Sequence, residues 1–245
     1  MRHLSERGSA LFYILIAIAL LAALSYAIAR SSRGNVGQLS DEQSRLAATE
    51  IVQYADTLSS ATGQLRLRGF DATEISFEND VISGYTNANC TEDACKIFKV
   101  GGGGVIYNKP SPDWNDGSDW YITMAACVQQ IGTGGSIGES CNTVGDGAKD
   151  LILFLPNVAK SVCVQINKFL GVTNPGDEPP LDKNASYTIS DPLKWTGSIP
   201  AGAAIGSNLS TDESYYLNGK SAACFEAQTT PTANSYHFYK VLIAR

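Results

Sequence analysis

The chain has 245 residues, with 18 basic and 24 acidic side chains, and 44% of its residues are hydrophobic. Residues 1–34 hold four of the basic residues and one of the acidic ones, which leaves 14 basic and 23 acidic residues in the remainder. This length and composition suit one moderately large domain with an appendage and exclude a disordered polar chain. The acidic excess excludes nucleic acid as a partner, because phosphate binding needs clustered Lys and Arg.

The first predicted element is an apolar helix. Residues 10–29 contain no charged side chain. As a helix they would span about 30 Å, the thickness of a hydrocarbon core, so we expect them to lie in lipid or in a helix bundle. Three interpretations are open: a secretory signal peptide cleaved after the Ala-x-Ala motif of residues 27–29, an uncleaved membrane anchor, and a prepilin-type leader.

The third interpretation depends on Glu6, Arg7 and Gly8, followed by Ser9 and an apolar run. This start resembles that of type IV pilins and type II secretion pseudopilins, and the resemblance covers about sixty residues. It implies that a prepilin peptidase cleaves between Gly8 and Ser9, and that the apolar helix first holds the subunit in the membrane and later packs in a filament core. The implied membrane and assembly residues are Leu11, Phe12, Tyr13, Ile14, Leu15, Ile16, Ile18, Leu20 and Leu21.

One position departs from the family pattern. Pilins usually carry glutamate at the fifth mature position, where this chain has Tyr13. That absence resembles the minor pseudopilin at a filament tip, which has no subunit above it. The resemblance implies a single pass through a bacterial inner membrane and then a periplasmic or extracellular filament. The charges that flank the apolar helix give only a weak orientation bias, so the cysteines after it decide the orientation, with the C-terminal body outside and the N-terminus inside.

A second helix is predicted after a joint that contains Gly34 and Gly37, because two close glycines weaken a helix. Ser40 and Gln43 have the spacing of a capping box. Apolar residues then recur at steps of three and four, which predicts a helix packed on its own domain, with an intermolecular coiled coil as the alternative. These stripe residues are Ala47, Ile51, Tyr54, Leu58, Ala61 and Leu65.

Six cysteines follow the apolar segment. An export signal with an even number of downstream cysteines indicates an oxidising compartment and up to three disulfides, although sequence alone leaves fifteen pairings. Short loops favour Cys90–Cys95, Cys127–Cys141 and Cys163–Cys224, and free buried cysteines are the alternative.

The body alternates short apolar runs with loops. We predict strands at 74–77 and 81–82, and at 97–100 and 105–107 on either side of a glycine hairpin loop. Further strands are predicted at 119–129, 150–155, 215–217, 223–225 and 236–243, with a helix over 158–170 that ends at Gly171. Residues 172–212 are expected to form surface loops around Trp195.

Catalytic and metal-binding chemistry has few candidates. The body's one histidine, His237, lies in a predicted strand and is expected to be solvated rather than catalytic. Trp114, Trp120 and Trp195 would bind a glycan or a protein if exposed, but buried packing is the default. We therefore predict that the protein is not an enzyme and has no cofactor and no metal centre. One loop is a weak candidate for calcium binding, although a surface turn explains its composition more simply. Its residues are Asp113, Asn115, Asp116 and Asp119.

Together these features predict an α+β, pilin-like fold. A leader (1–8), a transmembrane or filament-core helix with its joint (9–38) and an amphipathic helix (39–68) would precede a disulfide-bonded head with an antiparallel sheet (69–245). The expected function is a structural subunit, major or minor, of an extracytoplasmic filament or a secretion or adhesion apparatus. Expected partners are membrane lipid, copies of itself or related subunits, and prepilin peptidase. The alternative is a membrane-anchored or secreted binding domain without a filament role.

Overall fold

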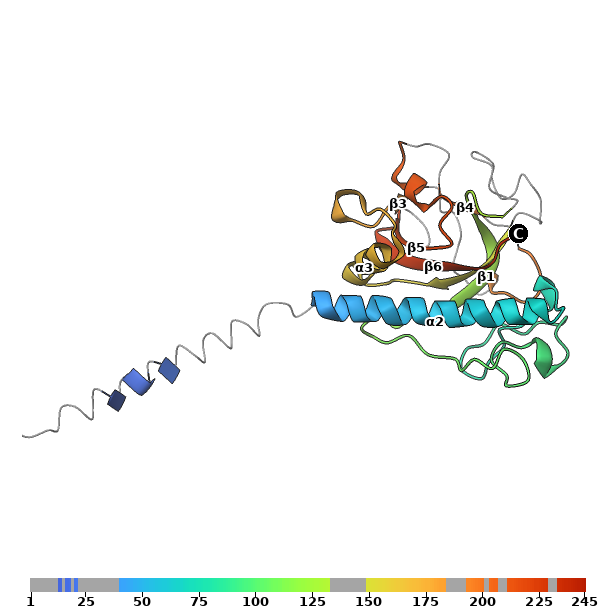
Figure 1. Ribbon diagram of the computed structural model, residues 1–245, viewed down its shortest axis with the longest axis horizontal. Coiled ribbons are helices and arrows are strands. Elements are labelled where there is room, and N and C mark those ends of the chain that lie inside the picture. The colour runs from blue at the N-terminus through green and yellow to red at the C-terminus, as the bar shows by residue number, and fades with distance from the viewer. Residues whose placement is uncertain are drawn as a thin grey trace, which may run out of the picture. The chain divides into compact units, whose positions relative to one another are not determined.

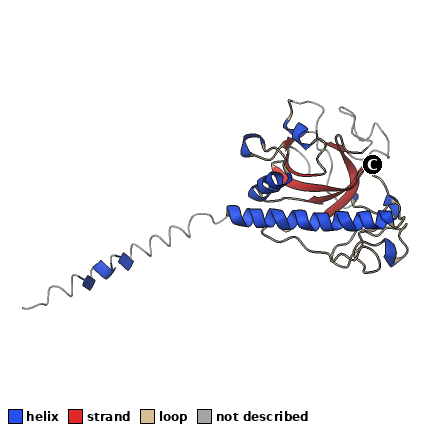
Figure 2. Cartoon of the chain, in the orientation of Figure 1, coloured by secondary structure: helices blue, strands red, loops and turns tan. Residues whose placement is uncertain are grey.

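The computed structural model describes residues 13–14, 16–18, 20–21, 40–132, 149–183, 193–200, 203–206, 211–228 and 233–245. The chain divides into two compact units, Met1–Leu39 and Ser40–Arg245. Figure 2 shows how helices and strands are distributed along it. The second unit contains the sheet and the two longest helices of the described chain.

Helix α2, Asp41–Leu67, organises the second unit. Its 27 residues give a length of about 40 Å. Both hydrogen bonds of the predicted capping box are present, since Gln43 N donates to Ser40 Oγ and Ser40 N donates to Gln43 Oε1. The predicted apolar stripe is confirmed for five of its positions, which are fully buried: Ala47, Ile51, Leu58, Ala61 and Leu65.

The described strands form one six-stranded sheet in the order β3-β5-β6-β2-β1-β4. The four inner strands β5, β6, β2 and β1 pair with one another in antiparallel, whereas the edge strands β3 and β4 pair in parallel with β5 and β1. Their bounds are β1, Tyr121–Val128; β2, Asp150–Leu155; β3, Leu181–Asp182; β4, Ala203–Ile205; β5, Ala222–Ala227; and β6, Ser235–Ile243.

Two helices cover one face of this sheet. Figure 1 shows α2 running along the sheet with α3, Lys160–Leu170, beside it. Helix α2 contacts α3 and β6, and α3 contacts β5. The Cys163–Cys224 disulfide joins α3 to β5, and Lys240 of β6 forms an ion pair with Asp56 of α2 at 2.7 Å. Helix α3 ends at Gly171, which has the left-handed φ of +67° that the sequence predicts for its C-cap.

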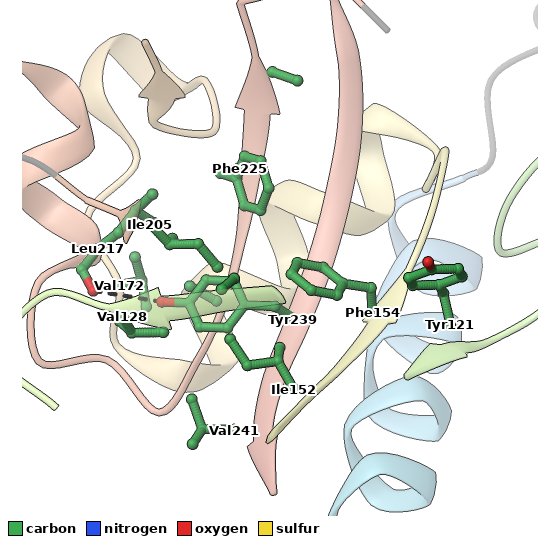
Figure 3. Packing of buried hydrophobic residues seen from close by; sticks show 13 residues of the cluster. Tyr121, Val128, Ile152, Phe154, Val172, Ile205, Leu217, Phe225, Tyr239 and Val241 are labelled. Carbon is green, nitrogen blue, oxygen red and sulfur yellow. Dashed lines mark hydrogen bonds between the residues drawn. The ribbon is translucent and has the colours of Figure 1, made fainter. Parts of the chain in front are cut away.

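The opposite face of the sheet has its own apolar cluster, shown in Figure 3. Tyr239 lies at its centre, with ring centroids 6.4 Å from Phe154 and 6.1 Å from Phe225. Its hydroxyl donates to Lys220 O at 2.9 Å. Because both faces are covered, β2 is buried at every residue, which explains why its sequence is continuously apolar after Asp150.

The predicted pilin-like fold is wrong. The six-stranded sheet is mixed in direction rather than antiparallel, because its two short edge strands pair in parallel. Helix α2 starts at its own capping residue, Ser40, and belongs to a different unit from the residues before it, so it does not continue one long N-terminal helix. The predicted joint at Gly34 and Gly37 lies outside the described residues.

The predicted location is contradicted as well. Among the described residues, no helix has both the length and the apolar character that crossing a membrane requires. This finding overturns the expected single pass through a bacterial inner membrane on the way to a periplasmic or extracellular filament.

Residues 68–120 contain none of the strands predicted for them. They hold two 3-10 helices, η1 (Ala72–Glu74) and η2 (Asp93–Cys95), and two isolated bridges. Local polar groups take the place of strand pairing, as when Asn79 Oδ1 accepts hydrogen bonds from both Val81 N and Ile82 N. The strand predicted at 215–217 is likewise part of a 3-10 helix, η6 (Glu213–Leu217).

Candidate functional site

The proposed cleavage site and part of the apolar segment lie outside the described residues: Gly8, Ser9, Leu11, Phe12 and Leu15. The described residues of this segment are helical. Their large apolar side chains are exposed by 41% to 67% of their surface: Tyr13, Ile14, Ile16, Ile18, Leu20 and Leu21. Within the first unit, therefore, these side chains are not buried.

Two of the three predicted disulfides are confirmed, Cys90–Cys95 and Cys163–Cys224. Cys127 is also disulfide-bonded, and its predicted partner Cys141 lies outside the described residues. The Cys163–Cys224 bond closes a loop of 61 residues, and a cross-link of that span stabilises a fold by about 4 kcal/mol in the chain-entropy model.

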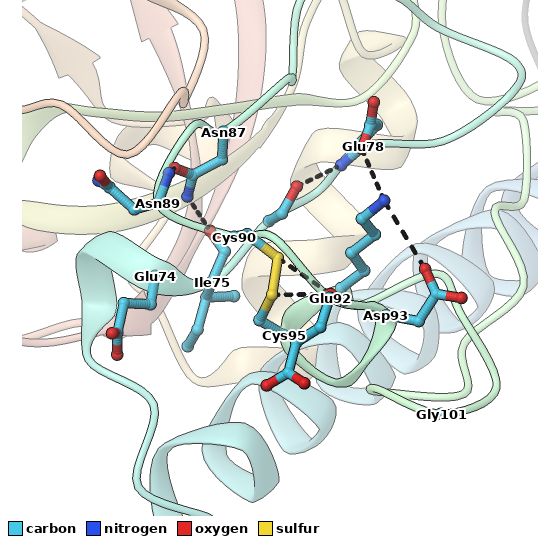
Figure 4. The surroundings of a disulfide bond; sticks show 12 residues. Glu74, Ile75, Glu78, Asn87, Asn89, Cys90, Glu92, Asp93, Cys95 and Gly101 are labelled. Atoms are coloured by element: carbon cyan, nitrogen blue, oxygen red, sulfur yellow. Dashed lines mark hydrogen bonds and ion pairs between the residues drawn. A yellow bond between two sulfur atoms is a disulfide. The ribbon is translucent and has the colours of Figure 1, made fainter.

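Figure 4 shows the surroundings of the Cys90–Cys95 disulfide, including Gly101, the first residue of the glycine run 101–104. Gly102 in this run serves close packing. A Cβ on Gly102 would lie 1.9 Å from Lys96 O, so only glycine fits this close backbone approach. Arg68 donates to the carbonyl oxygens of Gly101 and Gly102 at 3.1 and 2.9 Å, which holds the loop against the end of α2.

The candidate calcium loop is a hydrogen-bonded turn. Asn115 is buried and donates to Ser118 O and Pro156 O. Asp116 accepts from Ser118 and from Asn157, and Asp119 accepts from the Tyr107 hydroxyl at 3.3 Å. Among the described residues, no group of three or more His, Cys, Asp or Glu side chains is placed to hold a metal ion. Asp113 and the other three residues are thus not gathered into a metal site.

His237 is fully buried, so the expectation of a solvated histidine is wrong. Its Nε2 lies 2.6 Å from Ser235 Oγ, its Nδ1 has no hydrogen-bond partner, and its ring centroid is 5.7 Å from that of Phe225. Burial lowers the pKa of His237 to about 4, against a smaller opposing effect of the Asp116 carboxylate. Because no part of the ring is exposed, this Ser–His pair is a structural contact within β6.

Asp150 is a second buried titratable group, and nothing in the sequence marked it. Its carboxylate accepts hydrogen bonds from Val128 N at 2.9 Å and Arg245 N at 3.0 Å. Burial raises the pKa of Asp150 to about 6, although both backbone hydrogen bonds lower it. The carboxylate ties the start of β2 to two other segments.

The three tryptophans are buried, which confirms the packing default. Trp114, Trp120 and Trp195 expose 5%, 1% and 0% of their surface. Each indole N–H has a partner: Glu50 Oε2 at 3.2 Å, Asn108 O at 3.0 Å and Ile75 O at 2.9 Å, respectively. They are therefore not exposed ligand-stacking platforms.

A large concavity lies between α2 and the extended segment of residues 103–108. This hollow has a volume of about 970 Å³, and an adjoining hollow of about 470 Å³ lies toward Trp114. The two share Gln53, Tyr54, Thr57 and Asn108, so they form one open depression, which we call the α2 trough. Its helical side is formed by Glu50, Gln53, Tyr54, Asp56, Thr57, Ser60, Ala61 and Gln64.

Tyr54 is the central residue of the α2 trough. Its hydroxyl donates to Ile106 O at 3.4 Å and accepts from Asn108 N at 3.0 Å, so it connects α2 to the segment that forms the other wall. Its ring centroid lies 5.2 Å from that of Trp120. The sequence placed Tyr54 on the packed stripe of α2 but gave no signal that residues 103–108 would pack alongside it.

The chain matches no protein-family model, and neither a curated protein nor a solved structure shows significant similarity to it. Functional inference therefore depends on the residues of this chain.

Proposed function

We propose that this protein is a structural subunit, major or minor, of an extracytoplasmic filament or a related secretion or adhesion apparatus. The observation that carries this proposal is the exposure of the apolar helical residues between Tyr13 and Leu21. Ile14, Ile18 and Leu20 each expose 59% or more of their surface, whereas the apolar stripe of α2 is buried within its own unit. Among the described residues, the N-terminal segment gathers the longest run of exposed large apolar side chains, and an apolar partner would cover them.

The energetic argument favours other subunits as that partner. Burying one Ile or Leu side chain fully stabilises an assembly by about 1.5–3 kcal/mol. Association costs an estimated 4–15 kcal/mol, so several such side chains per subunit are needed to drive it. The nine apolar positions of the segment supply enough surface if each subunit packs its segment against those of its neighbours.

The disulfides support an extracytoplasmic setting, because such bonds are rare in reducing compartments. We propose that a prepilin peptidase cleaves after Gly8 and that copies of this chain or related subunits are its partners. We propose no catalytic role, since the one described histidine is fully buried and structural.

Intact-mass analysis of the protein from a bacterial host that processes prepilins tests the processing step. A mature chain that begins at Ser9 is expected. A mature chain that begins at Arg30 would indicate ordinary signal peptidase and contradict the filament role.

A matched pair of substitutions tests the assembly step. Ile18→Asp places a charge in the apolar segment, and Leu46→Asp places one on an exposed part of α2. The two positions are matched in exposure, at 59% for Ile18 and 61% for Leu46. Sedimentation should show that Ile18→Asp abolishes assembly while Leu46→Asp leaves it intact. Equal sedimentation of both variants and the parent protein would contradict the proposal.

The α2 trough favours a second candidate, a secreted extracytoplasmic binding domain without a filament role. A chain that begins at Arg30, remains monomeric and still binds a ligand would favour this candidate.

A further inference from the structure

We propose that the α2 trough binds an uncharged oligosaccharide. This inference goes beyond the filament role and does not depend on it. The trough extends along α2 from Glu50 to Gln64, a distance of about 21 Å at the rise of an α-helix. It is therefore an elongated site, suited to a chain-like ligand that lies along the helix rather than to a small enclosed metabolite.

The polar lining of the trough consists mainly of amide and hydroxyl groups. Gln53 and Gln64 lie on the helical wall and Asn108 on the facing wall, with Thr57 and Ser60 between the two glutamines. Each side-chain amide carries donors and an acceptor, and the Thr57 hydroxyl, which donates to Gln53 O at 2.9 Å, can still accept. Sugar hydroxyls also donate and accept, so this lining matches them without requiring a charged group on either side.

The charges around the trough favour a neutral ligand. The Asp56 carboxylate is paired with Lys240 at 2.7 Å, and Glu50 accepts the Trp114 indole N–H at 3.2 Å. At the same end of the trough, the positive charge of Lys109 is opposite in sign to the charge of the Glu50 carboxylate. An anionic ligand would face two carboxylates and a cationic one would compete with Lys240, whereas a neutral ligand disturbs none of these pairs.

The apolar part of the lining suits the C–H faces of sugar rings. Val105 and Ile106 form part of the wall, and the Ile106 side chain is 85% exposed. Tyr54 lines both hollows and is held in place by its two hydroxyl hydrogen bonds. Burial raises the pKa of Tyr54 to about 12, so the hydroxyl stays neutral at any physiological pH. A fixed aromatic side chain costs a ligand little ordering entropy.

An extended peptide fits the trough less well. Peptides that add to an edge need a row of free backbone groups. Along the facing wall, Val105 N donates to Ile97 O, the carbonyl of Ile106 and the amide of Asn108 bond to Tyr54, and Asn108 O accepts from Trp120. These four backbone groups of the wall are thus already engaged, which leaves an added strand fewer partners and favours recognition by side chains.

The test uses the full-length, disulfide-bonded protein on an array of neutral, sialylated and sulfated glycans, followed by titration calorimetry with the best neutral oligosaccharide. The double variant Gln53→Ala/Gln64→Ala removes both amides of the helical wall. The control Gln228→Ala removes an exposed amide at the end of β5, outside the trough. Neutral glycans should bind, the double variant should weaken binding about tenfold, and the control should change it by less than about twofold.

Nuclear magnetic resonance with the same oligosaccharide gives a second readout that needs no variant. The side-chain amide signals of Gln53, Gln64 and Asn108 should shift on titration, while that of Gln228 should not. Binding restricted to sialylated or sulfated glycans, binding that the double variant retains in full, or no binding of any neutral oligosaccharide at millimolar concentration would overturn the proposal. Displacement of the sugar by extended peptides that bind more tightly would assign the trough to peptides instead.

Discussion

His237 and Asp150 are two separate buried titratable groups whose effects on stability change with pH in opposite directions. We therefore predict an unusual dependence of stability on pH. The pKa of His237 is lowered from 6.5 to about 4 by burial, so its contribution to stability is complete above pH 6.5 and is lost as pH falls toward 4. The pKa of Asp150 is raised from 3.8 to about 6, so its contribution is complete below pH 3.8 and is lost as pH rises through 6. Between pH 6.5 and 4 the two changes offset each other.

The magnitudes follow from the shifts, at about 1.4 kcal/mol per pKa unit. Acidification from pH 7.5 to pH 4 should remove about 3 kcal/mol through His237 and return about 2 kcal/mol through Asp150. Both side chains are fully buried, so solvent screening does not reduce these values appreciably. The parent protein should therefore lose only about 1 kcal/mol from this pair.

Single substitutions separate the two contributions. Urea unfolding followed by tryptophan fluorescence, with the disulfides intact, gives the free energy of unfolding at each pH. Relative to the parent protein, His237→Gln should gain about 3 kcal/mol as pH falls from 7.5 to 4, and Asp150→Asn should lose about 2 kcal/mol over the same range. Exposed carboxylates titrate in all three proteins and cancel in these differences. Parallel pH profiles for the parent and both variants would refute the burial argument.

Three further predictions concern packing, covalent and capping features. Gly102→Ala should destabilise the protein by about 1–3 kcal/mol in urea unfolding, because the new Cβ would collide with Lys96 O. The control Gly101→Ala should have little effect, since the nearest atom to its Cβ would be 3.9 Å away. Equal effects of the two substitutions would contradict the packing role of Gly102. Replacing both cysteines of Cys163–Cys224 by alanine should cost about 4 kcal/mol, measured in the same way, and a loss below about 1 kcal/mol would contradict the loop-closure estimate. Ser40→Ala should lower the free energy of unfolding by about 1 kcal/mol and lower the thermal unfolding midpoint, because it removes the N-cap of α2. Ser40→Asp should preserve that midpoint, because aspartate also caps helices. A stability loss with Asp as large as with Ala would refute the capping role.

Local signals in the sequence were sufficient for the helices of the second unit. The spacing of Ser40 and Gln43 located the start of α2, and Gly171 located the end of α3, because caps depend on neighbouring residues alone. The apolar runs of β1 and β2 were also recognisable, since strands buried on both faces need apolar residues throughout. Two disulfide pairings followed from the preference for short loops, although Cys163–Cys224 spans 61 residues.

Features that depend on distant contacts could not be predicted. Strands β3 and β4 have two and three residues, too few for an alternating pattern, and each pairs in parallel with a strand far along the chain. The burial of His237 depends on what covers β6, which periodicity within β6 does not reveal. The α2 trough likewise needs Asn108 to approach Tyr54, 54 residues away, through an irregular segment.

Helix α2 and the helical segment between Tyr13 and Leu21 differ in whether their apolar side chains are buried, and this difference links the fold to the proposed function. Helix α2 carries one apolar stripe, which the sheet and α3 bury, so its remaining surface is available to form the trough with residues 103–108. The segment between Tyr13 and Leu21 has exposed apolar side chains and belongs to a separate unit. Burial within the second unit accounts for the apolar stripe of α2, whereas the side chains between Tyr13 and Leu21 are exposed in the first unit. The filament proposal assigns those exposed side chains to contacts between subunits and leaves the surface of the second unit free to bind a ligand.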